Sequence, residues 1–152
     1  MKVCSFNIRG INDLGKRQQV EKWMLAQEID ILCLQETKVN TNSTERREHH
    51  VWFFSSGVKA RTLESIEQLR KKGKRPTRTQ IEETREHYGV AFVVAKWLVP
   101  LITDVHPISD RLQTLTIRAA PDIHLITAYA PQAGLDSSDK QDFYTKIRGD
   151  LG

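Results

Sequence analysis

Three polar side chains stand where runs of apolar residues end. Asn7 closes the first run in SFNIRG, Glu36 follows the second in LCLQETK, and Tyr129 follows the last in ITAYAP. Mg²⁺ prefers oxygen ligands and usually takes one or two protein carboxylates, with water and substrate phosphate in its other positions. A tyrosine hydroxyl can donate a hydrogen bond to a phosphate oxygen as charge develops on it. The three residue types therefore indicate metal-assisted chemistry at a phosphate group.

Each of these residues also has a simpler explanation when it is considered alone. A Glu or Asn after a strand is commonly a turn residue, and a Tyr before Ala-Pro commonly packs at a surface. Their shared position at strand ends favours the chemical interpretation, because the loops of an α/β fold gather there into a site.

Short strands and intervening helices must position these residues. Alternation at period two predicts a strand over Lys2–Ile8, and Ile29–Leu34 has the continuous apolar character of a strand covered on both faces. Apolar residues at helical spacing predict a helix between them, from residue 15 or 16 to Gln27. This order is compatible with a crossover unit, but it does not fix whether the two strands are parallel.

The rest of the chain alternates loops, strands and helices. The polar segment 39–50 is predicted as a loop with a short helical turn at Ser43–Arg47, and the capping sequence DSSD predicts a helix over Asp136–Asp150. The further predicted strands are Val51–Ser55, Gly89–Ala95, Val99–Val105, Leu112–Arg118 and Ile123–Ala128. The pattern is typical of an α/β protein with several antiparallel strands, arranged as a two-sheet sandwich flanked by helices.

The order of these motifs resembles the endonuclease/exonuclease/phosphatase superfamily. Five blocks carry the resemblance: SFNIRGIN, DILCLQETK, YGVAFVVA, SDRLQTLTIRA and HLITAYAPQAG. It is nearest to the apurinic-endonuclease-like domain of LINE-type retrotransposon proteins and covers essentially the whole chain apart from a basic insert. The resemblance implies a DNase I-like α/β sandwich of mixed, mostly antiparallel strands with flanking helices.

The resemblance also implies roles for single residues. Glu36 of LQET corresponds to the family's metal-binding glutamate, and Asn7 to the asparagine that orients metal and phosphate, which implies a Mg²⁺ or Mn²⁺ site. Tyr129 of AYAP corresponds to the active-site tyrosine on the substrate phosphate. Arg111 corresponds to an arginine at a strand start, for which support of the site and a structural ion pair are both open.

The chain departs from the family pattern after Tyr129. The family's later motifs resemble Gly-Asp-Phe-Asn, a further aspartate and Ser-Asp-His, which serve the nucleophile and the general base, and none of them is found. Asp150 lies in Gly-Asp-Leu-Gly, with Gly152 where the family has Asn, so it is not assigned to the site. We therefore expect residues 1–152 to form the N-terminal half of the domain, weak or inactive alone, with a C-terminal half or a downstream reverse transcriptase as the implied partner.

The excess positive charge lies in one segment. The chain carries 23 Lys/Arg and 19 Asp/Glu, and residues 59–87 hold nine of the former and five of the latter, which leaves fourteen of each elsewhere. The breaker GKRP at 73–76 divides this insert into two predicted helices, Leu63–Lys72 and Thr79–Glu86. Six basic residues and no acidic one lie in its centre: Arg70, Lys71, Lys72, Lys74, Arg75 and Arg78.

Three interpretations of the insert remain open. Clusters of Lys and Arg supply the salt-dependent, non-specific part of DNA binding. KKGKRP also has the composition of a nuclear-import signal. A solvated loop between two charged helices is the third interpretation.

Other sequence features indicate where in the cell the protein is expected. No apolar run approaches the ~18 residues that a membrane-spanning helix needs, and MKVCSFNIRG lacks the layout of a signal peptide. We expect an intracellular protein, in the nucleus or cytoplasm, with no membrane partner. Cys4 and Cys33 are predicted as buried small hydrophobic residues without a disulfide, and the five histidines as solvated or hairpin residues.

The leading hypothesis is a Mg²⁺-dependent endonuclease that nicks DNA by water attack on a backbone phosphate. A phosphatase of the same superfamily, acting on inositol phosphates or lipids, is disfavoured by the apurinic-type spacing of LQETK and AYAP. A non-catalytic remnant that binds nucleic acid through the basic insert is the alternative from a different class.

Overall fold

The chain begins with a strand, a crossover helix and a second strand. In the computed structural model, β1 (Val3–Asn7) and β2 (Ile31–Gln35) pair in parallel, so that Asn7 lies opposite Gln35. Parallel neighbours need a crossover connection, which α1 (Leu14–Ala26) supplies. The Asp13 carboxylate caps α1 by accepting a hydrogen bond from the Gly15 amide at 2.7 Å. The question that the sequence left open is therefore settled in favour of a parallel pair.

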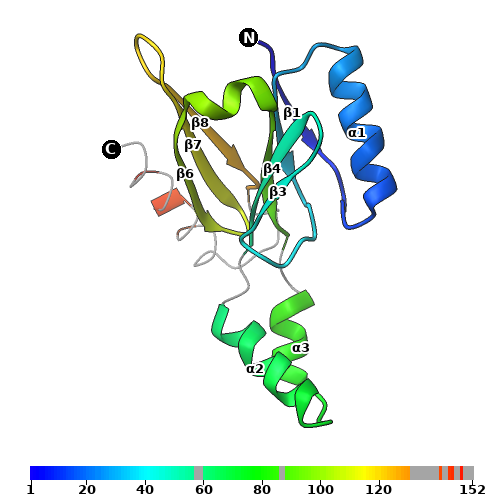
Figure 1. The fold of residues 1–152 in the computed structure, drawn as a ribbon. Helices are drawn as coiled ribbons and strands as arrows, with labels where there is room; N and C mark the ends of the chain where they lie inside the picture. The colour runs from blue at the N-terminus through cyan, green and yellow to red at the C-terminus, as the bar shows by residue number, and fades with distance from the viewer. Residues whose placement is uncertain (57–59, 86–87, 131–140, 142–143, 146–147, 149–152) are drawn as a thin grey trace.

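The strands form two stacked sheets (Figure 1). The structure describes residues 1–56, 60–85, 88–130, 141, 144, 145 and 148. The first sheet has the order β1-β2-β5-β4-β3, with β3 (Thr44–Arg46), β4 (His50–Ser55) and β5 (Val90–Ala95). The second is an antiparallel sheet of β6 (Ile102–Ser109), β7 (Leu112–Ile117) and β8 (Ile123–Ala128).

The central strands β2 and β5 of the first sheet are covered on both faces, which explains their continuous apolar runs. On one face, Leu32 and Leu34 pack with Met24 of α1. On the other face, Cys33 and Phe92 pack against β7 of the second sheet. Fully burying side chains of this size stabilises a fold by about 1.5–3 kcal/mol each. The predicted two-sheet sandwich with flanking helices is confirmed.

Two predicted elements were wrong. The helical turn at Ser43–Arg47 is strand β3, because residues 44–46 pair with β4. The strand predicted at Val99–Val105 begins only at Ile102, because Lys96–Leu101 forms a 3₁₀ helix, η1, that contains Pro100 and buries Leu98. Most of the predicted helix at Asp136–Asp150 lies outside the described residues.

The basic insert consists of two helices, α2 (Ala60–Lys71) and α3 (Arg78–Arg85), separated at GKRP as predicted. They pack against each other and extend from one end of the sandwich (Figure 1). The hairpin that they form joins β4 to β5.

Both cysteines are free, as expected. Cys33 is buried and Cys4 half-buried. Burial raises the pKa of the Cys33 thiol to about 11, so this group stays protonated and apolar. The described residues include no helix that is both long and apolar enough to cross a membrane.

A buried ion-pair network holds the β3–β4 hairpin against α1. Arg17 of α1 bonds to Glu45 of β3, and Arg47 bonds to both Glu45 and Glu21. His50 lies beside this network with 1 % of its surface exposed, and its Nδ1 is 3.9 Å from a Glu21 oxygen. The expectation that all five histidines are solvated or hairpin residues is therefore wrong for His50.

The burial of His50 predicts an acid-sensitive fold. Burial lowers the pKa of His50 below 6.5, with opposition from Glu21 and smaller support from His49 and Arg47. The unfolded chain therefore takes up this proton at a higher pH than the folded chain. The contribution of neutral His50 to the free energy of unfolding is complete above pH 6.5, the ordinary pKa of histidine, and declines as the pH falls below that value. The decline is at most about 1.4 kcal/mol per pH unit for one proton.

Urea unfolding at several pH values between 7.5 and 5 tests this prediction. We expect His50→Asn to flatten the dependence of the unfolding free energy on pH, and His106→Asn, at an exposed residue of β6, to leave it unchanged. Parallel pH dependences for the wild-type and His50→Asn proteins would contradict the assignment.

Candidate active site

The ends of four strands meet at one end of the sandwich. β1 ends at Asn7 beside Gln35 of β2, and Gln35 lies opposite Val90 at the start of β5. The second sheet joins this end through Thr127 of β8, whose hydroxyl donates to the Leu34 carbonyl at 3.2 Å. The same hydroxyl accepts from the Gln35 amide at 3.2 Å. The stacking of the sheets therefore brings the residue after β8, Tyr129, to the residue after β2.

The structure brings Glu36, Asn7 and Tyr129 together at the strand ends. The Tyr129 hydroxyl and the Asn7 amide form hydrogen bonds with the Glu36 carboxylate. The bond from Tyr129 is the largest effect that holds the pKa of Glu36 below its usual 4.5. The desolvation of this group opposes that effect, and Asn7, Lys38 and Arg9 reinforce it. Glu36 is therefore a carboxylate throughout the neutral range.

The backbone around Glu36 is held in an unusual conformation. Glu36 and Lys38 have φ values of 56° and 61°, in the left-handed region that costs non-glycine residues about 1–3 kcal/mol each. Hydrogen bonds on both sides offset this cost. The Glu36 carbonyl accepts from the Gly10 amide at 2.6 Å, and the Lys38 amide donates to the Tyr88 carbonyl at 2.8 Å. The turn leaves Glu36 half-buried and Lys38 exposed at the site, with Thr37 buried between them.

Arg111 is brought into the site by aromatic contacts. Its guanidinium carbon lies 4.6 Å from the centre of the Tyr88 ring and 5.2 Å from that of Tyr129, and its Nη1 donates to the Tyr129 carbonyl at 3.3 Å. No described residue forms an ion pair with it. Of the two interpretations that were open, the contacts therefore favour support of the site.

Tyr88 and Lys38 belong to the site but were not assigned to it from the sequence. The rings of Tyr88 and Tyr129 are 4.9 Å apart, and the Lys38 ammonium lies 4.6 Å from the Tyr88 ring. Both residues stood inside motif blocks, YGVAFVVA and LQETK. The signal that could have found them is their position within three residues of the paired ends of β2 and β5.

The residues present fit a hard divalent cation. Asn7 is exposed and Glu36 half-buried, so both oxygen donors face water. The Asn7 side-chain N–H donates to Glu36, which leaves the Asn7 carbonyl oxygen as a neutral ligand beside the charged carboxylate. Among the described residues, no three His, Cys, Asp or Glu side chains gather as a zinc site would require. One carboxylate with a carboxamide is the ligand set that Mg²⁺ accepts, since water and phosphate complete its shell.

The six basic residues of the insert do not enter this cluster. They lie on the α2–α3 hairpin, which begins after Ser56 and ends before Tyr88. Asp150, which was not assigned to the site, lies outside the described residues.

A two-sheet α/β sandwich with a carboxylate, a carboxamide and a tyrosine hydroxyl at the ends of its strands is an arrangement that suits phosphate chemistry. Residues 4–148 match the model of the endonuclease/exonuclease/phosphatase family, and the chain belongs to that family. The fold is the DNase I-like sandwich of the family. No curated protein matched the chain. Members of the family typically depend on a divalent metal ion.

Proposed function

We propose that this protein is a Mg²⁺- or Mn²⁺-dependent endonuclease that nicks DNA by hydrolysis of a backbone phosphodiester. The observation that carries the proposal is the contact of Glu36 with both Asn7 and Tyr129 at one end of the sandwich. Membership of the family supports phosphate ester hydrolysis in general, by a nuclease or a phosphatase.

In this proposal, Glu36 and Asn7 would hold the metal ion. The ion, when bound, would supply positive charge that stabilises the developing negative charge on the phosphate. Glu36 is suited to this role because its lowered pKa keeps it charged. Tyr129 keeps Glu36 ionised by donating to it, and it offers the same hydroxyl to a phosphate oxygen when substrate is bound.

Charge favours a polyanionic substrate. The insert carries the whole net charge of +4, and it is attached next to the site through Tyr88. The resemblance of the motif blocks to LINE-type proteins supports a retrotransposon-type role, in which the nick leaves a 3′-hydroxyl that primes reverse transcription. DNA is therefore the substrate that we propose over an inositol phosphate or a lipid.

We also propose that residues 1–152 act as part of a domain and are weak alone. In the part of the chain that the structure describes, no histidine is among the groups that influence the pKa of Glu36. The described residues therefore supply no imidazole general base at the site. A further segment or partner with that base would raise the rate.

Nicking of supercoiled plasmid is the test. We expect slow conversion to the open circular form with Mg²⁺ or Mn²⁺ and none with EDTA, because the site lacks its cation there. Nicking that persists in EDTA, or that persists in the Glu36→Gln variant, would contradict the proposed mechanism.

A non-catalytic nucleic-acid-binding role is the second candidate. The observation that favours it is the absence of an imidazole base among the described residues around Glu36. Binding of plasmid by both the wild-type and Glu36→Gln proteins, without nicking by either, would support this candidate over the first.

A further inference from the structure

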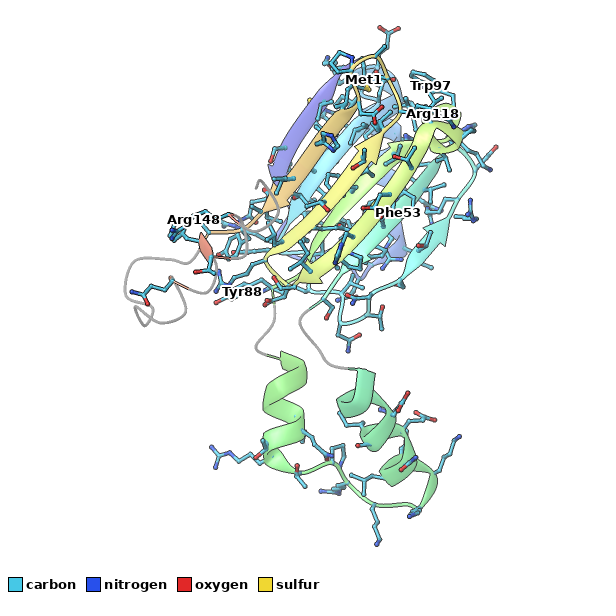
Figure 2. All side chains as sticks on the ribbon, turned by 90° about the vertical axis from the view of Figure 1, so that its left-hand side faces the viewer. Met1, Phe53, Tyr88, Trp97, Arg118 and Arg148 are labelled. Carbon is cyan, nitrogen blue, oxygen red and sulfur yellow. The ribbon has the colours of Figure 1, made fainter. Side chains whose placement is uncertain are left out.

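The α2–α3 hairpin is attached at the candidate active site. The strands on either side of it, β4 and β5, are neighbours, with Ser55 opposite Val90. Tyr88 stands between the hairpin and β5 in the sequence, and its ring packs against that of Tyr129 at a tilt. Figure 2 shows Tyr88 at the end of the sandwich from which the hairpin extends. Whatever binds at Glu36 is therefore next to the base of the hairpin.

The turn between the two helices has a defined structure. Gly73 has a φ of +71°, its amide donates to the Arg70 carbonyl at 3.0 Å, and the Lys74 amide donates to the Leu69 carbonyl at 2.8 Å. This pair of bonds is the Schellman motif that ends a helix. Thr77 then begins α3 through reciprocal bonds with Gln80, of 2.9 and 3.2 Å, which form a capping box. The turn is therefore built to hold its basic side chains at a fixed place.

This turn carries a cluster of exposed cations, which we call the basic tip: Arg70, Lys71, Lys72, Lys74, Arg75 and Arg78. All six residues are exposed, and no acidic residue interrupts them in the sequence. Within the described residues, Arg70 has one distant acidic neighbour, a Glu67 oxygen at 3.9 Å. The tip therefore concentrates six positive charges on one exposed turn.

Helix length places the basic tip well beyond the active site. The twelve residues of α2 span about 18 Å at ~1.5 Å per residue. Since each strand of B-form DNA advances about 3.4 Å per base pair, this length corresponds to roughly five base pairs. A phosphate bound at Glu36 and one bound at the tip would be separated by a stretch of duplex.

We propose that the α2–α3 hairpin is an arm that binds the backbone of the same DNA duplex about five base pairs from the phosphate at Glu36. This inference rests on the proposed endonuclease function. The arm explains why charge is placed on an ordered turn at the far end of the hairpin. It lengthens the contact with substrate without adding to the reacting centre.

The chemistry of the tip fits a nucleic acid better than a membrane surface. A peptide that binds at a bilayer combines basic residues with exposed apolar or aromatic side chains. None of the exposed large apolar residues that the structure describes belongs to the hairpin. Ile66 and Ile81 of the hairpin are half-buried, and its two helices pack against each other.

The test compares two triple variants of the same charge. The tip variant is Lys72→Gln, Lys74→Gln, Arg75→Gln, and the control is Lys22→Gln, Arg46→Gln, Arg118→Gln, at exposed residues of the body. Arg118 lies at the end opposite Tyr88 in Figure 2. Circular dichroism and thermal unfolding check that both variants keep their helices and stability.

Binding of a labelled 30-base-pair duplex is measured in EDTA, which separates it from catalysis. We expect the tip variant to bind at least about tenfold more weakly at low salt, and its log Kd against log salt slope to fall by about three, one for each phosphate contact. The control variant is expected to lose much less affinity for the duplex. Equal loss in both variants, or no loss in the tip variant, would overturn the proposal.

Phosphodiester hydrolysis is measured on two substrates, a plasmid and a small diester. We expect the tip variant to be slower on plasmid but equal to the wild-type protein on bis(4-nitrophenyl) phosphate, which occupies only the site. A tip variant that is slowed equally on both substrates would overturn the arm. A wild-type protein that cleaves neither substrate, but whose duplex binding depends on the tip, would contradict the proposed function and leave the arm supported.

Discussion

Replacing Glu36 with glutamine is expected to reduce metal-dependent nicking by at least about a hundredfold, because a metal ion contributes several kcal/mol to the transition state and 1.36 kcal/mol is tenfold in rate. Glutamine has the same size and keeps hydrogen-bonding capacity toward Asn7 and Tyr129, but it has no charge for the cation. Plasmid nicking at several Mg²⁺ concentrations measures the effect. Recovery of full activity at high Mg²⁺ would mean that Glu36 contributes only affinity for the metal.

Glu28→Gln is a matched control for this change. Glu28 has the same φ value as Glu36, 56°, and is exposed before β2 begins, at the other end of that strand. The same substitution in the same backbone conformation is therefore made outside the site. Equal loss of nicking in both variants would point to a general effect of charge or folding and would contradict the role of Glu36.

The loss of activity at low pH should follow the protonation of Glu36. The Tyr129 hydroxyl is the largest effect that holds the pKa of Glu36 below 4.5, so the folded protein keeps the charge to a lower pH than the unfolded chain does. The stabilisation from this group is complete above 4.5 and is lost as the pH falls through the lowered value. Tyr129→Phe should therefore shift the loss of metal binding to higher pH.

The sequence predicted the framework because burial dictates residue type. β2 and β5 are covered on both faces, so their apolar runs were readily identified as strands, and Asn7, Glu36 and Tyr129 could be placed at strand ends. The parallel pairing of β1 with β2 could not be predicted, since apolar periodicity is the same for either direction.

The features that the sequence did not predict depend on partners far along the chain. His50 follows the polar segment Arg46–His49, and its burial depends on the packing of α1 and Glu21 against the β3–β4 hairpin. The contact of Tyr88 with Arg111 and Tyr129 likewise requires both sheets to be in place. Strand-end position identified the candidate ligands, but the side chains that support them come from tertiary packing.

Replacing Gly89 with alanine is expected to destabilise the fold by about 2–4 kcal/mol, from left-handed backbone strain and overpacking together. Gly89 has a φ of +79°, and an added Cβ would lie 2.3 Å from the Thr37 hydroxyl and 3.3 Å from the Val39 carbonyl. Thr37 is fully buried, so its side chain cannot move into solvent. Urea unfolding measures the change.

Two comparisons separate strain from collision. Gly73 has a similar φ of +71° but nothing within 4 Å of an added Cβ, so Gly73→Ala should cost only the backbone strain, about 1–2 kcal/mol. Thr37→Ala removes the colliding oxygen, so Gly89→Ala should cost less in that background than in the wild-type protein. Equal costs in both backgrounds would exclude the collision. Because the Thr37 amide donates to the Gly89 carbonyl at 3.0 Å, a displaced Thr37 would carry the Glu36 turn with it and weaken nicking as well as the fold.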